Sequence, residues 1–364
     1  MVEITLQLKC QINYRVIYRG SYRVCFRLSH LCEWLLRSNV YEGKIPMKIA
    51  VIGTGIAGVS VAKRLAALPL YQVELFDKGR SAGGRMSVRH TGAHSFDHGA
   101  QFFTTRTAAF KDFLRDYQSS GVVKEWQPKI ATLSPKAELQ DRVWREPHFV
   151  ALPNMNGLCK AICEELNVLH DTQVHTVEKH GGYWWLKTAE QDFGPYDWVV
   201  STAPPEQTRQ MFPDNIGQDM DATCFAPCFS LLLGCSGSLP SWDAAIVKDS
   251  PVNWLAFIDR KPGQHSQPSL VAHADGVWSQ LHYDTDREEV KHLLVDAVAS
   301  VAEITHETAG LHRWRYARVT DPLGKDFWID EPSQLAACGD WCIGNRVEDA
   351  FASATCLAQW FEKS

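Results

Sequence analysis

KIAVIGTGIAGVSVAKRL, residues 48–65, opens with an apolar run, continues through three spaced glycines and ends in a helix-like pattern. The run MKIAVIG is typical of a strand buried on both faces of a parallel sheet. Gly53 permits a tight turn, Gly55 lets the backbone approach a pyrophosphate, and Gly58 lets the helix pack close to the strand. This order of strand, turn and helix predicts a Rossmann-type unit with a pyrophosphate at the helix N-terminus.

A second expected strand, YQVELFDK, brings an acidic residue to the position that a ribose requires. Asp77 follows Gly53 by 24 residues, and an acid at this distance accepts hydrogen bonds from a ribose diol. The alternative is a structural turn in an α/β protein that binds no ligand. We therefore expect dinucleotide binding. The expected contacts in this region are Gly53, Gly55, Ile56, Ala57, Gly58, Asp77 and Lys78.

Length and charge exclude several classes of protein. The 364 residues are enough for two domains and a large core. A net charge of −5 argues against a nucleic-acid partner, because such a partner requires a basic surface. The sequence has no run of about 18 apolar residues, so we expect neither a transmembrane helix nor a membrane partner.

The eleven cysteines predict reduced thiols rather than a disulfide framework. Their number is odd and no secretory signal is visible, so we expect a cytoplasmic location. Three cysteine pairs have CxxxC spacing, whereas zinc sites more often use CxxC pairs with matched partners. We expect small buried side chains and no metal site. The three pairs are Cys159/Cys163, Cys224/Cys228 and Cys338/Cys342.

Two further motifs bear on the identity of the dinucleotide. KGRSAGGRMSVRH, residues 78–90, contains paired glycines and then Arg85, whose guanidinium fork suits a phosphate. The alternative is a surface loop with a solvated arginine. LAACGDWCIGNRVEDAFASATCLAQWF, residues 335–361, predicts an apolar strand, then Gly339-Asp340, then a helix beginning near Val347-Glu348.

Together these motifs resemble those of the flavin-containing amine oxidase superfamily. The resemblance implies non-covalent FAD, with the GGR arginine and the late Gly-Asp motif at the pyrophosphate and the last helix N-terminus aimed at the isoalloxazine. NAD-only Rossmann enzymes lack this pairing of chain ends. The implied fold is α/β: a Rossmann-like FAD-binding domain (GR2-type flavoprotein) with an α+β substrate domain built on an antiparallel sheet. The additional cofactor contacts implied are Gly84, Arg85, Met86, Gly99, Ala100, Gln101, Val174, Gly339, Asp340, Val347 and Glu348.

Four other stretches resemble the renalase branch of this superfamily. They are FDHGAQFFTTR (96–106), VNWLAFIDRKPG (252–263), LVAHADGVWS (270–279) and LHRWRYARV (311–319). With the earlier motifs, the resemblance spans residues 47–361. One departure lies in the late helix, where VEDAFASA has Asp349 and Ala354 at or near positions that are often glycine in the family. This difference bears on packing against the flavin ring.

The FAD-binding domain is expected to be discontinuous. We expect amphipathic helices over 106–118 and 287–304, a further helix over 152–166, and a hairpin around Gly181-Gly182. A strand containing Val174 either contributes backbone groups near the adenine or is an ordinary edge strand. The expected segments are 47–105, 150–215 and 315–364 for the FAD-binding domain, and 106–149 and 216–314 for the substrate domain.

Residues 1–46 form a basic segment before the first expected strand. They hold seven Lys/Arg and three Asp/Glu, and Arg15, Arg19, Arg23 and Arg27 recur at helical spacing. One interpretation is an organelle presequence, but the segment is poor in serine and rich in Tyr, Val and Ile. We favour a disordered extension or a non-native start, with translation beginning at Met47.

The renalase resemblance implies oxidation of isomeric 1,2- or 1,6-dihydro-NAD(P) to NAD(P)⁺, by hydride transfer to flavin N5, with O₂ reduced to H₂O₂. This reaction is a metabolite repair and requires no general base. The expected substrate-side residues each have a structural alternative. Gln101 is a hydrogen-bonding amide or a loop residue, Trp254 an aromatic wall or core, His273 a donor or a core histidine. Arg315 neutralises a phosphate or pairs with a carboxylate.

Three other functions stay open at this point. A flavin amine oxidase acting on a small amine has the same expected fold and oxygen chemistry. A non-catalytic FAD-binding protein would leave its flavin oxidised with every donor. A relative of the desaturases or of protoporphyrinogen oxidase would act on a lipid-soluble substrate, although residues 47–364 show no basic amphipathic docking helix. The sequence leaves open monomer or dimer, the exact substrate and the physiological electron acceptor.

Overall fold

A computed structural model of the chain describes residues 45–135, 137–142 and 146–364. Residues 47–364 form one compact unit, and the following description concerns that unit. The expectation of a presequence or a disordered extension falls on residues 1–46, which lie outside the described part apart from residues 45 and 46.

Three distant parts of the chain build one six-stranded sheet, in the order β10-β2-β1-β14-β21-β20. Neighbouring strands run parallel, except β20 and β21 at one edge. β1 is buried from Ile49 to Ile52, because both faces of its apolar run are covered. This confirms the expected Rossmann-like sheet. Its strands are β1 (Met47–Ile52), β2 (Tyr71–Phe76), β10 (Asn167–Leu169), β14 (Trp198–Ser201), β20 (Trp328–Asp330) and β21 (Leu335–Ala337).

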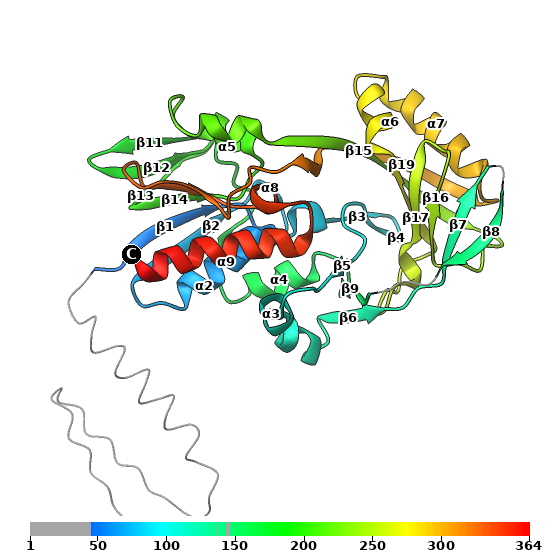
Figure 1. The fold of residues 1–364 in the computed structure, drawn as a ribbon, viewed down its shortest axis with the longest axis horizontal. Helices are drawn as coiled ribbons and strands as arrows, with labels where there is room; N and C mark the ends of the chain where they lie inside the picture. The colour runs from blue at the N-terminus through cyan, green and yellow to red at the C-terminus, as the bar shows by residue number, and fades with distance from the viewer. Residues whose placement is uncertain (1–44, 136, 143–145) are drawn as a thin grey trace, which may run out of the picture. The chain divides into compact units, whose positions relative to one another are not determined.

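Two layers cover this parallel sheet (Figure 1). Helices α2 (Ile56–Ala66), α4 (Gly157–Cys163) and α9 (Val347–Lys363) pack on one face. The other face is covered by a three-stranded antiparallel sheet of β11 (Thr176–His180), β12 (Tyr183–Lys187) and β13 (Asp192–Tyr196). The hairpin expected around Gly181-Gly182 is confirmed: both glycines have positive φ and join β11 to β12.

A second, seven-stranded sheet has the order β19-β15-β18-β17-β16-β7-β8. It is antiparallel except for the β7–β16 pair, which is parallel. One face packs against α7 (Arg287–Ala299), and the other contributes Leu232 and Val271 to the core beside α2 and α9. The strands are β7 (Ile130–Ser134), β8 (Ala137–Arg142), β15 (Cys224–Ser236), β16 (Ala244–Val247), β17 (Val252–Phe257), β18 (Ser269–Ala274) and β19 (Thr305–Asp321).

The remaining elements connect the two sheets. β3 (Val88–Thr91) and β4 (His94–Asp97) form a hairpin, and β5 (Phe103–Thr104), β9 (His148–Ala151) and β6 (Val123–Trp126) form a small sheet. The other helices are α3 (Ala108–Ser119), α5 (Pro205–Met211), α6 (Gly276–Leu281) and α8 (Asp340–Ile343).

Several expected boundaries were wrong in detail. α4 begins at Gly157 rather than at 152, because residues 152–156 form a turn in which the Met155 N–H is donated to Asp97. α7 ends at Ala299 rather than 304. Val174 is buried but precedes β11 instead of lying in a strand. The expected domain boundary between residues 314 and 315 falls inside the strand β19. The division of the chain into domains remains a prediction.

An aromatic cluster joins α9 to α3. The Phe351 ring on α9 lies 5.0 Å from the Phe110 ring and 4.7 Å from the Phe113 ring. Phe351 is buried, and Phe110 is fully buried. Contacts between aromatic rings stabilise a fold beyond the burial of their apolar surface. The cluster therefore links α3 firmly to the C-terminal helix α9.

We therefore expect Phe351→Ala to lower the free energy of unfolding by about 3–5 kcal/mol, because it leaves a cavity beside Phe110. Urea unfolding followed by tryptophan fluorescence measures the change. Tyr183→Ala is the matched control, since Tyr183 is 47% exposed on a hairpin and should change this free energy by about 0.5 kcal/mol or less. Equal losses in both variants would contradict the prediction.

Candidate functional site

The turn between β1 and α2 has no room for a side chain at Gly53 or Gly58. Gly53 has a φ of +109°, and a Cβ there would lie 2.4 Å from Thr202 Oγ1. A Cβ on Gly58 would lie 1.9 Å from the Gly53 carbonyl oxygen. Among the described residues, no side chain caps α2 at Gly55, so the first helical amides keep their N–H groups for an anion. This turn fits the pyrophosphate of a dinucleotide.

The carboxylate of Asp77 closes this turn from the neighbouring strand. Its Oδ2 accepts hydrogen bonds from the Thr54 amide and the Thr54 hydroxyl, each at 2.6 Å, and its Oδ1 accepts from the Gly79 amide at 2.7 Å. A carboxylate offers about four lone-pair positions, so acceptor capacity remains for a ribose hydroxyl. The sequence predicted the ribose contact alone, and the structure adds that Asp77 orients the glycine turn.

The paired glycines face the first turn at close range, and the approach is tightest at Gly84. Gly84 has a φ of +53°, and a Cβ on it would lie 3.2 Å from the Gly55 Cα. A Cβ on Gly55 would in turn lie 3.8 Å from the Gly84 Cα. Two stretches that are 29 residues apart thus form one cradle without side chains. A cradle of this kind suits a long, flat, phosphate-bearing cofactor such as FAD.

Arg85 and Asp340 join the two ends of the chain at this cradle. The Arg85 Nη1 donates to Asp340 Oδ2 at 2.9 Å, and its Nη2 donates to Oδ1, which makes a two-pronged ion pair. The Asp340 side chain is 5% exposed, and Arg85 keeps 35% of its side chain exposed. Because Arg85 is partly exposed and has further N–H groups, it is able to bind a phosphate without leaving Asp340.

The loop 97–101 continues from this cradle toward the second sheet. The Ala100 amide donates to the Arg85 carbonyl at 2.9 Å, and a Cβ on Gly99 would lie 1.9 Å from the same oxygen. The Gln101 Nε2 donates to the carbonyls of Asp97 and Gly99. The Gln101 Oε1 therefore faces away from them and has no hydrogen-bond partner among the described residues, although Gln101 is 5% exposed. It is a buried acceptor that a ligand would satisfy.

Polar and aromatic side chains line up across four strands of the seven-stranded sheet. His312 on β19 pairs with Ser230 on β15, Ser230 with His273 on β18, and His273 with Trp254 on β17. Side chains directly opposite one another on neighbouring strands share one face of a sheet. Leu232 and Val271, two residues along, lie on the face that packs toward α2 and α9. This row therefore faces the cofactor-binding part.

The carbonyl oxygen of His98 anchors the loop to this row. It accepts hydrogen bonds from Ser230 Oγ at 2.8 Å, Trp314 Nε1 at 2.9 Å and His273 Nε2 at 3.3 Å. Phe102, just after the loop, lies 5.7 Å from Trp254 between ring centres. Three predicted substrate-side residues, Gln101, Trp254 and His273, are thus brought to one wall.

Burial keeps the histidines of this wall neutral. Desolvation lowers the pKa of His98 and of His273 to about 4, and that of His312 to about 3. A carbonyl oxygen only accepts, so the His273 Nε2 carries the proton, and its Nδ1 is a bare acceptor. The sequence predicted a donor at this position, whereas the structure engages that N–H with the His98 carbonyl.

One predicted substrate-side residue, Arg315, does not join the wall, and two predicted cofactor contacts, Lys78 and Val174, lie elsewhere. Arg315 points from the other side of β19 and its Nη2 lies 2.8 Å from Glu206 Oε1, so it makes the carboxylate pair that the sequence left as the alternative. Lys78 is exposed. Val174 packs in the core with Val177 beneath the three-stranded sheet.

The two acidic residues in the first turn of α9 accept hydrogen bonds from neighbouring loops. The Glu348 carboxylate accepts from the Thr107 amide and hydroxyl, each at 2.7 Å, and from the Arg106 amide at 3.0 Å. Val347 begins the helix as expected. Asp349 accepts from the Asn345 and Arg346 amides at 3.0 Å and caps α9, so its carboxylate is turned back toward the preceding loop.

Three wall residues were not singled out from the sequence: Ser230, His312 and Trp314. A signal for two of them was present in LHRWRYARV, where alternation puts His312 and Trp314 on one face and Arg313 and Arg315 on the other. Arg313 and Arg315 are exposed, and the other two are partly buried. For Ser230, the signal is a single hydroxyl within the apolar run FSLLLGC.

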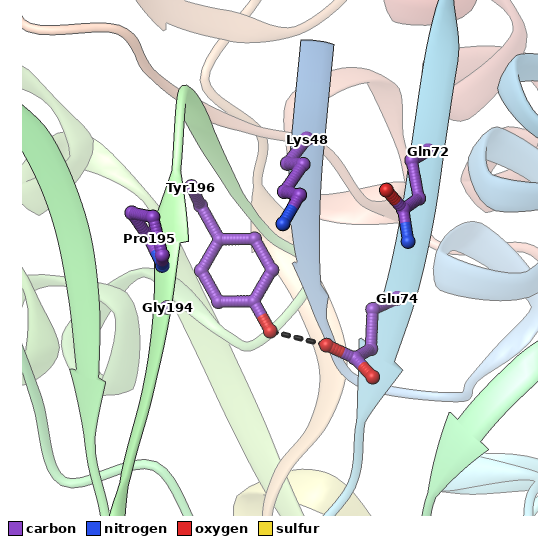
Figure 2. A pocket seen from close by; sticks show the side chains of 6 residues that line it. All are labelled: Lys48, Gln72, Glu74, Gly194, Pro195 and Tyr196. Carbon is purple, nitrogen blue, oxygen red and sulfur yellow. Dashed lines mark hydrogen bonds between the residues drawn. The ribbon is translucent and has the colours of Figure 1, made fainter. Parts of the chain in front are cut away.

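Other features of the described residues lie outside this site. A small pocket is lined by Lys48, Gln72, Glu74 and Tyr196, with the Tyr196 hydroxyl bonded to Glu74 (Figure 2). It lies beside β1, β2 and β13, away from the carboxyl ends of the parallel strands where ligands of this fold bind. Residues 45–364, as far as they are described, contain no cluster of metal-ligating side chains. None of their helices is long and apolar enough to span a bilayer.

Two family models match the chain. An NAD(P)-binding Rossmann-like domain matches residues 51–117, and the flavin containing amine oxidoreductase model matches residues 132–359, which is more than half of the chain. Prenylcysteine oxidase 1 of Bos taurus is 31% identical over 94 residues, 25% of this chain and 18% of that protein. A 1-hydroxycarotenoid 3,4-desaturase of Flavobacterium is 42% identical over 57 residues, 16% of this chain and 12% of the desaturase. The alignments span less than a fifth of these relatives.

Solved structures share the fold at low sequence identity. A double mutant of putrescine oxidase has a TM-score of 0.68 at 10% identity, covering 88% of this chain and 100% of that one. An oxidoreductase from Methanosarcina mazei has a TM-score of 0.65 at 12% identity, covering 86% and 100%. Reduced UDP-galactopyranose mutase has a TM-score of 0.66 at 12% identity, covering 88% and 95%. These likenesses establish the fold alone.

The glycine turn yields a direct prediction for cofactor retention. Gly58→Ala should give a folded protein that purifies with at least about tenfold less FAD, because its Cβ would displace the Gly53 carbonyl. The flavin absorbance near ~450 nm per polypeptide measures the loss. Gly310→Ala is the control, since a Cβ there makes ordinary contacts at 3.7 Å with Leu232. Full FAD content in Gly58→Ala would refute the assignment of the turn.

Asp349→Ala should lower the free energy of unfolding by about 1 kcal/mol, because two amides before α9 lose their acceptor. FAD content and the visible spectrum should stay unchanged, since the carboxylate faces the preceding loop. Asp349→Asn keeps an acceptor oxygen and serves as the comparison in thermal unfolding. A changed flavin spectrum in Asp349→Ala would show that this side chain acts on the cofactor.

Proposed function

The chain belongs to the flavin containing amine oxidoreductases, FAD-dependent enzymes, and we propose that it oxidises isomeric dihydronicotinamide dinucleotides. The substrates proposed are 1,2- and 1,6-dihydro-NAD(P), and the balanced reaction is dihydro-NAD(P) + O₂ + H⁺ → NAD(P)⁺ + H₂O₂. The four stretches that resemble renalases support this substrate class. The proposal includes a small-molecule substrate and O₂ as the only partners.

The described residues fit FAD at the cradle of Gly55 and Gly84. Asp77 would hold the ribose, the α2 N-terminus and Arg85 would hold the pyrophosphate, and Asp340 would keep Arg85 in place. When bound there, FAD supplies a two-electron acceptor that O₂ can reoxidise. The protein itself contributes binding, orientation and exclusion of water.

The observation that carries the proposal is the neutral character of the substrate-side wall. Trp254 offers an aromatic surface, His273 offers a bare Nδ1 acceptor, and Gln101 offers an unpaired Oε1 acceptor. The carboxylate of Asp97, in the same loop as Gln101, is already paired with Lys261. A protonated amine entering a buried wall needs an unpaired anion or an aromatic cage. A flat, uncharged dihydropyridine needs only a stacking surface and hydrogen bonds.

Each of these groups has a role in the proposed reaction. Trp254 packs against the ring and holds it flat. The carboxamide NH₂ of a nicotinamide has two N–H groups, which suits the two acceptors of Gln101 and His273. The ring nitrogen lone pair drives loss of the hydride, so no residue has to remove a proton. These residues therefore contribute to the rate by orienting the substrate ring, not by acid–base chemistry.

An anaerobic titration tests the proposal. Adding 1,2- or 1,6-dihydro-NAD to the holoenzyme should bleach the flavin absorbance near ~450 nm and yield NAD⁺. A small amine such as putrescine should leave the absorbance unchanged. Bleaching by amines alone would overturn the substrate class, and a flavin that stays oxidised with every donor would indicate a protein that binds FAD without catalysis.

The limiting rate of this reduction should not depend on pH between about pH 6 and about pH 9. The pKa of His273 is lowered from 6.5 to about 4 by burial, so its neutral form prevails above pH 5. Protonation would remove the Nδ1 acceptor, and the rate should fall only as the pH approaches that value. Stopped-flow reduction across this range measures the profile. A rise in rate with an apparent pKa near 7 would instead indicate a required base.

A further inference from the structure

Lys261 and Asp97 form an ion pair inside the protein, next to the substrate-side wall. The Lys261 Nζ lies 3.0 Å from Asp97 Oδ2, and each side chain is 1% exposed. Asp97 Oδ1 accepts from the Met155 amide at 3.0 Å, so both oxygens of the carboxylate are engaged. The Lys261 Nζ also lies 5.7 Å from the centre of the Trp126 ring.

Such a pair is a poor device for stability alone. Desolvation of two buried charges consumes most of their mutual attraction, and apolar residues of similar volume often serve a fold equally well. A buried charge pair is nevertheless demanding in geometry, because any shift that separates the partners leaves a charge without compensation. A pair of this kind therefore holds the segments that carry its two partners in a fixed relative position.

The pair fixes three segments that meet at loop 97–101. Asp97 ends β4 and begins the loop, Lys261 follows the turn after β17, and Met155 lies in the turn before α4. The backbone carbonyl of Asp97 accepts a hydrogen bond from the Gln101 side-chain Nε2. The next carbonyl, that of His98, accepts the His273 Nε2. The carbonyl that orients Gln101 thus belongs to Asp97 itself, and the carbonyl that orients His273 belongs to the next residue.

We propose that the Lys261–Asp97 pair is a positioning device, which locks loop 97–101 so that Gln101 and His273 present their acceptors to the ligand. Neither charge touches the reacting atoms. Lys261 also has an electrostatic effect, because its charge adds to the burial that lowers the pKa of His273 and keeps Nδ1 bare. The kinetic test of this role rests on the proposed function, because it uses dihydro-NAD as the reductant. The spectral test requires only bound FAD.

The test uses a neutral double variant, Asp97→Asn with Lys261→Met, prepared as the FAD-loaded full chain. Removing both charges leaves no uncompensated ion, so the protein should fold and retain FAD. The loop then loses its anchor, and the limiting rate of anaerobic reduction by 1,2- or 1,6-dihydro-NAD should fall about 100-fold, as for a misplaced reactant. The visible band of the bound flavin should also shift. A double variant with wild-type rate and wild-type spectrum would overturn the proposal.

Two further variants separate position from stability. Tyr71→Phe removes a buried hydrogen bond to the Phe361 carbonyl at the far end of β2, and should leave rate and spectrum unchanged. Lys261→Arg keeps the opposite charges with a different reach, and should lower the rate while FAD remains bound. If the double variant loses its FAD, a wild-type rate in Lys261→Arg overturns the proposal and a reduced rate supports it.

The two proposals fail in different ways. If the wild-type flavin is not reduced by either dihydronicotinamide, the proposed function is wrong. The flavin spectrum and midpoint potential of the double variant then decide the positioning role: unchanged values reject it, and shifted values support it.

Discussion

Backbone contacts that only glycine allows hold this protein's site together. The Gly84 and Gly55 backbones approach so closely that a Cβ on Gly84 would lie 3.2 Å from the opposite Cα, and Gly99 approaches the Arg85 carbonyl more closely still. The Ala100 amide donates a hydrogen bond to the same Arg85 carbonyl. This bond ties the glycine cradle to loop 97–101, which packs against the second sheet. A side chain at Gly84 would be strained by the positive φ, and one at Gly99 would displace the Arg85 carbonyl, so either would disturb the link between the nucleotide cradle and the substrate-side wall.

Beyond this cradle, the site depends on how polar groups are satisfied in a buried environment. The His98 carbonyl accepts hydrogen bonds from three side chains, one on each of β15, β18 and β19. The Asp97 carboxylate accepts from the Lys261 ammonium and the Met155 amide. Because an unpaired buried polar group is costly, these bonds select one loop conformation. Among the described residues of this loop, the Gln101 Oε1 and the His98 Nδ1 are left buried without a hydrogen-bond partner.

The two chain ends contribute to the same region for a topological reason. β1, near the start, and β21, near the end, both flank β14 in the parallel sheet. Parallel strands place their carboxyl ends at one edge, so Gly53 and Gly339 emerge on the same side. The Arg85–Asp340 ion pair then closes the gap between the two motifs. α9 completes the arrangement by packing Phe351 against α3.

The sequence by itself determined the nucleotide turn, the strands that flank it and the general position of the late Gly-Asp motif, because these depend on local glycine geometry and on short-range periodicity. It also indicated Gln101, Trp254 and His273 as candidates. Only the tertiary structure decided that these three share a wall, that Arg315 pairs with Glu206, and that His273 uses its N–H on a carbonyl. Strand register, and thus the row from His312 to Trp254, is set by pairing between residues that are 19, 43 and 82 positions apart in the sequence. No local pattern specifies such pairing, because it is chosen by which buried faces and polar groups can be satisfied together.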